Sequence, residues 1–98
     1  MRNLNITDYQ ENDIITKEYV DSKLGSTPRS EISSVVFANK KFILGKQALA
    51  DMINLTNIVK SEYIIKVNDY ALANTAIKDF VRSLSCDYIG KHAFENCS

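Results

Sequence analysis

Apolar residues recur along the second half of the chain at a nearly constant interval. Residues 44–49, 67–72 and 89–94 share one order of types: an aliphatic residue, Gly or Asn, two polar residues, Ala, and a large apolar residue. Ala48, Ala71 and Ala93 are 23 and then 22 residues apart. A period of this size is typical of a solenoid, whose units are too small to bury their own apolar faces and must stack on neighbours. The pattern therefore favours a scaffold or a binding surface over an enzyme.

Each repeating unit is predicted to be a short strand, a tight turn or short helix, and a second extended piece. Two amphipathic helices at 48–58 and 71–80 would place apolar residues at a similar spacing. Helices do not require Gly or Asn at one offset and Ala at another, so the solenoid is favoured. The inward positions predicted to form the repeat core are Leu44, Ala48, Leu55, Ile58, Val67, Ala71, Ile77, Ile89, Ala93 and Phe94.

Only two units are complete, because the third stops at Ser98. A solenoid needs about three repeats and a cap at each end. We therefore expect a partner chain to complete the third unit, or a longer natural chain, or an open edge that binds a partner. All three expectations point to assembly.

The third unit resembles a known family. Residues 89–98 match the hallmark of BspA-type leucine-rich repeats, Ile-Gly-x-x-Ala-Phe-x-x-Cys, and the resemblance extends over about residues 35–98. In the upstream units Leu49 and Leu72 replace the Phe, and Met52 and Thr75 replace the Cys. The resemblance implies a right-handed stack of short strands, found on bacterial or phage surface proteins and used for adhesion.

A short helix is predicted at residues 16–25. Thr16 is a suitable N-cap, Glu18 lies in the first turn beside the positive end of the helix dipole, and Gly25 suits the left-handed residue that ends a helix. A helix of this length does not persist alone in water, so its apolar side must pack on something else. That side is formed by Tyr19, Val20 and Leu24.

The same segment resembles a second family. Residues 13–24 contain Thr-Lys-x-Tyr-Val-Asp-x-x-Leu, which is similar to a segment of tailed-bacteriophage fibre proteins. In those proteins it forms a short helix at a joint of a homotrimer. The resemblance implies that Tyr19, Val20 and Leu24 contact neighbouring subunits. Packing of the helix on the chain's own repeat domain is an alternative of equal weight.

The remaining segments complete the predicted organisation. Residues 1–15 are expected to be an extended anchoring arm that adds to another protein, with Leu4, Ile6 and Tyr9 as anchoring residues. Residues 26–34, which contain Pro28, are expected to be a linker, and residues 35–98 the leucine-rich-repeat body. The predicted fold class is mixed α/β and β-rich: an arm, a short helix, and a solenoid of two to three units.

Composition excludes several functions. Twelve basic and twelve acidic residues give a net charge of zero, so there is no electrostatic footprint for nucleic acid. No apolar stretch suits membrane insertion, and the N-terminus lacks a signal-peptide core, so synthesis in a cytoplasm is expected.

Cys86 and Cys97 are expected to be buried thiols, and two Cys with one His do not make a structural zinc site. Since no phosphate loop or nucleophile motif occurs either, we expect no catalytic residue, cofactor or metal.

Together these patterns predict a virion structural protein. It would be a fibre or fibre-base subunit of a phage head or tail, assembling as a homotrimer with other virion proteins and contacting a host surface through its repeats. The alternative is a small cytoplasmic, phage-encoded binding protein or inhibitor that uses the open edge of the repeats.

Overall fold

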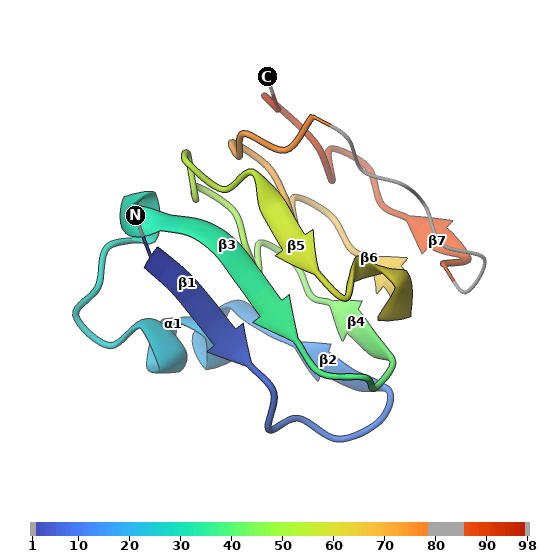
Figure 1. Cartoon of the computed structure of the whole chain (residues 1–98). Helices are drawn as coiled ribbons and strands as arrows, with labels where there is room; N and C mark the ends of the chain where they lie inside the picture. The colour runs from blue at the N-terminus through green and yellow to red at the C-terminus, as the bar shows by residue number, and fades with distance from the viewer. Residues whose placement is uncertain (1, 79–85, 98) are drawn as a thin grey trace.

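Two parallel β-sheets face each other in the computed structural model, which describes residues 2–78 and 86–97 (Figure 1). The strands of the smaller sheet, in spatial order, are β1 (Arg2–Ile6), β3 (Ile32–Phe37) and β5 (Asn57–Val59). The strands of the larger sheet are β2 (Asp13–Ile15), β4 (Phe42–Leu44), β6 (Ile64–Val67) and β7 (Tyr88–Ile89). From β1 to β6 the chain alternates between the sheets, and β7 then adds to β6 in the larger sheet, so neighbours in each sheet are successive passes of the chain.

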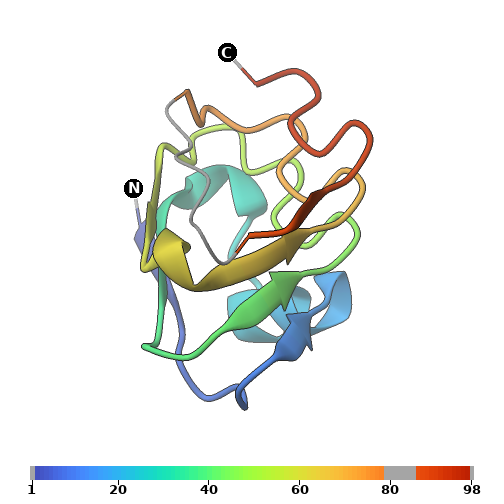
Figure 2. The same ribbon diagram turned by 90° about the vertical axis from the view of Figure 1, so that its right-hand side faces the viewer.

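One α-helix and two short 3-10 helices complete the described structure. Helix α1 (Lys17–Leu24) follows β2, η1 (Arg29–Glu31) precedes β3, and η2 (Ser61–Tyr63) precedes β6. Figure 2 shows the strands of the larger sheet above one another in chain order, with the segments that follow them stacked on one side. The fold is therefore a small α/β arrangement with one α-helix and parallel strands, which agrees with the predicted mixed α/β class.

The core lies between the sheets and under the turns. Because side chains alternate across a strand, each strand sends every second residue inward. One inward row joins Ile15, Leu44, Val67 and Ile89 in register. Eight of the ten predicted repeat-core residues are buried, while Ile89 and Phe94 are partly buried against the same core.

The N-terminal segment is not an extended arm. Strand β1 pairs in parallel with β3, and β2 pairs in parallel with β4. Leu4, Ile6 and Tyr9 are buried in the chain's own core, so the prediction that they anchor the chain to another protein is corrected. The physical reason is that Leu4 and Ile6 alternate with polar residues in the same period as β3, so β1 finds a matching strand within the chain.

The predicted linker is also structured. Residues 26–34 contain η1 and the first residues of β3, and Ile32 is only 2% exposed. The body of stacked strands therefore begins in the first residues of the chain rather than at residue 35.

The turns after β4, β6 and β7 repeat one backbone conformation. Each turn has two left-handed residues at equivalent positions, and together these are Gln47, Asp51, Tyr70, Asn74, His92 and Asn96. The glycines that precede the turns have a different role. A Cβ on Gly45 would lie 2.8 Å from the carbonyl oxygen of Ile15, and one on Gly90 would lie 2.4 Å from Oδ1 of Asp69. Gly is therefore required at these two positions, where the turns after β4 and β7 approach the preceding unit, whereas the turn after β6 has Asn68 at the same offset.

Hydrogen bonds between successive turns run in one direction. The Leu49 N–H donates to the Ala71 carbonyl and the Leu72 N–H donates to the Ala93 carbonyl, each at 2.9 Å. Each turn therefore directs N–H groups toward the next unit and carbonyls toward the preceding one. A side-chain ladder beside these bonds runs in the opposite direction: the Asn96 amide donates to Asn74 Oδ1 at 2.9 Å, and the Asn74 amide donates to Asp51 Oδ1 at 2.8 Å.

Arg29 takes the place of a preceding turn at the first unit. Its Nη1 donates to the carbonyls of Ala48 and Ala50 at 3.0 and 2.8 Å, the positions that accept backbone N–H groups in the next turn. Nη2 also donates to the Asp21 carboxylate on α1 at 2.9 Å. That hydrogen bond is the main reason why the pKa of Asp21 lies below its usual value. The guanidinium fork thus ties the helix to the first turn.

Replacing Arg29 with Ala should lower the free energy of unfolding by about 2 kcal/mol, since a buried carbonyl without a donor costs ~1–3 kcal/mol. Arg29→Lys should recover only part of this, because one ammonium cannot reproduce the planar fork. Urea denaturation followed by circular dichroism measures both effects. Arg2→Ala, which removes an exposed ion pair with Glu31, is the control and should cost less than about 0.5 kcal/mol. Equal losses for the Arg29 and Arg2 variants would contradict the capping role.

Candidate functional site

Helix α1 packs on the core of its own chain. The Thr16 hydroxyl accepts a hydrogen bond from the Tyr19 N–H at 3.0 Å, and Gly25 ends the helix at a φ of 60°. Val20 and Leu24 are 0% and 7% exposed, and Tyr19 is partly buried. Of the two alternatives for this helix, the structure shows packing within the chain. Val20 and Leu24 are therefore not available to neighbouring subunits, which corrects their assignment to a subunit interface.

The outer face of the larger sheet carries a row of side chains across all four strands. In register these are Ile14, Ile43, Lys66 and Tyr88. Ile14 and Tyr88 are large apolar side chains with exposed fractions of 54% and 47%. The spacing of the strands places them roughly 14 Å apart, at the two ends of the row.

Two hollows lie where these strands run into their turns. One has a volume of about 300 Å³ and is lined by residues of β2, α1 and the segments that follow β4 and β6, including Ile14, Lys46 and Asn68. The other, of about 250 Å³, is lined by Lys46, Asn68, Asp69 and Tyr88. Because Lys46 and Asn68 line both, we treat the hollows and the outward row as one surface, the sheet groove.

The chemistry of the sheet groove suits recognition. Lysine ammonium groups and the Asn68 amide donate hydrogen bonds, Asp69 accepts them, and Tyr88 offers an aromatic face. The sequence repeat does not reveal this surface, because the residues that repeat are the ones that face the core. The available signal was the apolar character of Ile14 and Tyr88 at outward positions of their strands.

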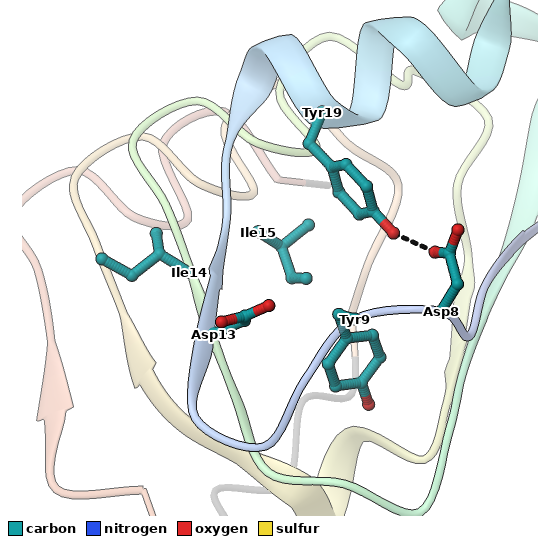
Figure 3. A pocket seen from close by; sticks show the side chains of 6 residues that line it. All are labelled: Asp8, Tyr9, Asp13, Ile14, Ile15 and Tyr19. Carbon is teal, nitrogen blue, oxygen red and sulfur yellow. Dashed lines mark hydrogen bonds between the residues drawn. The ribbon is translucent and has the colours of Figure 1, made fainter.

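A third hollow, the end pocket, lies beside β2 at the N-terminal end of the stack. It has a volume of about 230 Å³ and is lined by Asp8, Tyr9, Asp13, Ile14, Ile15 and Tyr19. Figure 3 shows Tyr19 reaching down from α1 toward Asp8, which lies on the loop after β1. The pocket shares Ile14 with the sheet groove, so the two surfaces are continuous.

Charged and polar groups are concentrated at the end pocket. The Tyr19 hydroxyl donates a hydrogen bond to Asp8 Oδ1, and Lys23 Nζ lies 2.5 Å from Asp8 Oδ2. Both bonds lower the pKa of Asp8 below its usual value, and the bond from Lys23 has the larger effect. Burial, and then the bond to Asp8, raise the pKa of Tyr19 to about 12.

Tyr9 forms the inner wall of the pocket. Its hydroxyl donates to the backbone carbonyl of Lys40 at 2.7 Å, and its ring packs edge-on against Phe37 and Phe42. Burial raises the pKa of its phenol. Tyr9 is therefore a rigid structural wall rather than a mobile side chain.

The described residues hold no group of three or more His, Cys, Asp or Glu side chains that could bind a metal ion. Within the same residues, no helix is long and apolar enough to span a membrane. Cys86 is buried and Cys97 half-buried, and they form no disulfide. The Cys97 Sγ lies 3.1 Å from the Leu72 carbonyl and 3.3 Å from the Thr75 hydroxyl, so this thiol belongs to the stacking of the turns.

One comparison with known proteins gives a match. The model of the family described as BspA type Leucine rich repeat region (6 copies) matches residues 27–98. No curated protein and no solved structure matches the chain.

Removing the negative charge from the group that accepts the Tyr19 hydroxyl should lower the pKa of this phenol. In Asp8→Asn the value should fall from about 12 toward 10, without reaching it, because burial is the larger cause and remains. Asp13→Asn should lower it less, since Asp13 acts on Tyr19 only through its charge. Ultraviolet titration of each variant, with Tyr19→Phe subtracted to assign the signal, measures the change. A Tyr19 pKa unaffected by Asp8→Asn would contradict this geometry.

Proposed function

This chain belongs to the BspA-type leucine-rich repeat family, and we propose that it is a non-enzymatic recognition and assembly protein whose contact surface is the sheet groove. The observation that carries the proposal is the row from Ile14 to Tyr88, which leaves two large apolar side chains exposed at the ends of a hollowed polar surface. Apolar anchors combined with hydrogen-bonding groups in a hollowed surface offer both kinds of contact that protein interfaces use.

The backbone supports such a role because it holds the groove rigid. Strands β4 and β6 are paired on both sides, and the turns that carry Lys46 and Asp69 are hydrogen-bonded to each other. A surface that is ordered before binding loses little conformational entropy when a partner docks. We treat the stacked strands and turns as a short solenoid, whose units present equivalent positions side by side.

Residues 16–24 are similar to a segment of tailed-phage fibre proteins, and this similarity favours a role in a virion. In this form of the proposal the chain is a fibre or fibre-base subunit that assembles as a homotrimer. Since Val20 and Leu24 are buried, the trimer contacts would come from the exposed side of α1, where Glu18, Ser22 and Lys23 lie, and not from its apolar side.

The second candidate is a small phage-encoded inhibitor or binding protein that acts as a single chain. The intrachain packing of α1 favours it, because a helix buried on its own core does not need neighbouring subunits. Both candidates use the sheet groove, and they differ in oligomeric state.

Polar replacement of both ends of the groove should weaken recognition without unfolding the protein. We expect Ile14→Ser with Tyr88→Ser to weaken binding about thirtyfold, since the two apolar anchors together contribute ~2 kcal/mol at an interface. The probes are purified bacterial surface polysaccharides and an immobilised peptide library. Ile53→Ser is the control, because Ile53 is 58% exposed and lies outside the groove. Absence of binding by the wild type, or an equal loss in the control, would contradict the proposal.

The virion candidate predicts a trimer of the 11.1 kDa chain in solution. Light scattering after size-exclusion chromatography measures the mass. Ser22→Trp, on the exposed side of α1, should reduce the trimer to monomers, whereas Asn57→Trp on β5 should not. A stable wild-type monomer would rule out the trimer and leave the inhibitor candidate.

A further inference from the structure

We propose that the end pocket is a second binding site, which takes the ammonium or guanidinium end of a basic side chain. It borders the groove proposed above and shares Ile14 with it, but its carboxylates lie outside the groove and the inference does not depend on that proposal. Its lining combines two carboxylates, two tyrosine rings and two isoleucines, with no lysine or arginine among the six residues. Such a lining suits a ligand that carries a positive charge at the end of an apolar chain.

Asp13 is the carboxylate best placed to receive the cation. Its Oδ2 accepts a hydrogen bond from the Gln10 N–H at 2.9 Å, which orients the group without neutralising its charge. Among the described residues, no basic side chain lies within ion-pair distance of Asp13. Asp8 differs, because Lys23 already forms an ion pair with it.

The chain contains an internal example of the same recognition. The Lys23 ammonium contacts the Asp8 carboxylate and lies 5.5 Å from the centre of the Tyr19 ring. A cation within about 6 Å of an aromatic ring is attracted by the ring's electron distribution. The Tyr9 ring makes a similar contact with Lys40, whose ammonium lies 5.7 Å from its centre. A second ammonium would therefore be held chiefly by the Asp13 carboxylate, in a pocket lined by both rings.

The position of the pocket supplies further contacts. All three residues of β2 line it, and β2 is an edge strand, so one side of its backbone faces the pocket instead of another strand. Ile14, which is 54% exposed, is the apolar side chain of the lining that is accessible to the methylene stem of a lysine or arginine. A metal ion does not fit as well, because hard cations require about six oxygen ligands and the pocket has two carboxylates.

The test is a two-dimensional NMR titration of the whole chain with n-butylammonium, n-butanol and butyrate. We expect saturable shifts of the amides of Asp8, Asp13, Ile14 and Tyr19 with butylammonium only, weakening as salt is added. Asp13→Asn should weaken binding about tenfold, the loss expected for a charge-assisted contact. Asp87→Asn, an exposed carboxylate next to β7, is the matched control and should leave the affinity unchanged.

Two further probes separate the sources of the cation. A capped Gly-Lys-Gly peptide that binds more tightly than spermidine would identify a polypeptide partner, and the reverse order would identify a free polyamine. The proposal is overturned if butanol shifts the same amides as butylammonium, if no saturable shift occurs at these residues, or if Asp13→Asn and Asp87→Asn have equal affinity. The three-ligand comparison on the wild type decides the matter even if a variant does not fold.

Discussion

The parallel stacking of successive chain passes is the constraint on which the rest of this structure depends. A parallel pair of strands cannot be joined by a tight hairpin, so from β1 to β6 each pass crosses to the second sheet before it returns. The two sheets therefore grow together, one strand at a time, and the side chains between them form one continuous core. The turns must lie against one another at backbone distance, which is why Gly45 and Gly90 have no room for a Cβ.

The same constraint explains which parts of the fold could be predicted from the sequence. The period from Ala48 to Ala93 identifies the repeating units and most of their buried positions, because stacking demands the same residue type at the same offset. The first unit escaped detection, because α1 replaces the repeating turn and Tyr19 stands where the later units have Ala. The alternation of Leu4 and Ile6 was read correctly as extended chain, but an alternating pattern does not show whether the matching strand lies in the same molecule.

The surface features were harder to predict than the core. Outward residues have no packing constraint, so Ile14 and Tyr88 show no period, and their alignment follows only from the strand register. The end pocket joins side chains of β2, α1 and the loop after β1, and nothing in the sequence places Asp8 against Tyr19. Arg29 falls in the segment predicted to be a linker, because a sequence gives no sign that a side chain takes the place of the backbone N–H groups of a preceding turn.

The direction of the hydrogen bonds between turns gives the stack a chemical polarity. The face toward the N-terminus presents carbonyl oxygens, so only a donor such as the Arg29 guanidinium can satisfy it. The opposite face of a turn presents N–H groups, which require carboxylates, amides or another backbone. A unit added after the last turn can therefore dock its carbonyls on the N–H groups of that turn. A unit inserted before the first turn would displace Arg29 and would need a donor of its own on its carbonyl face.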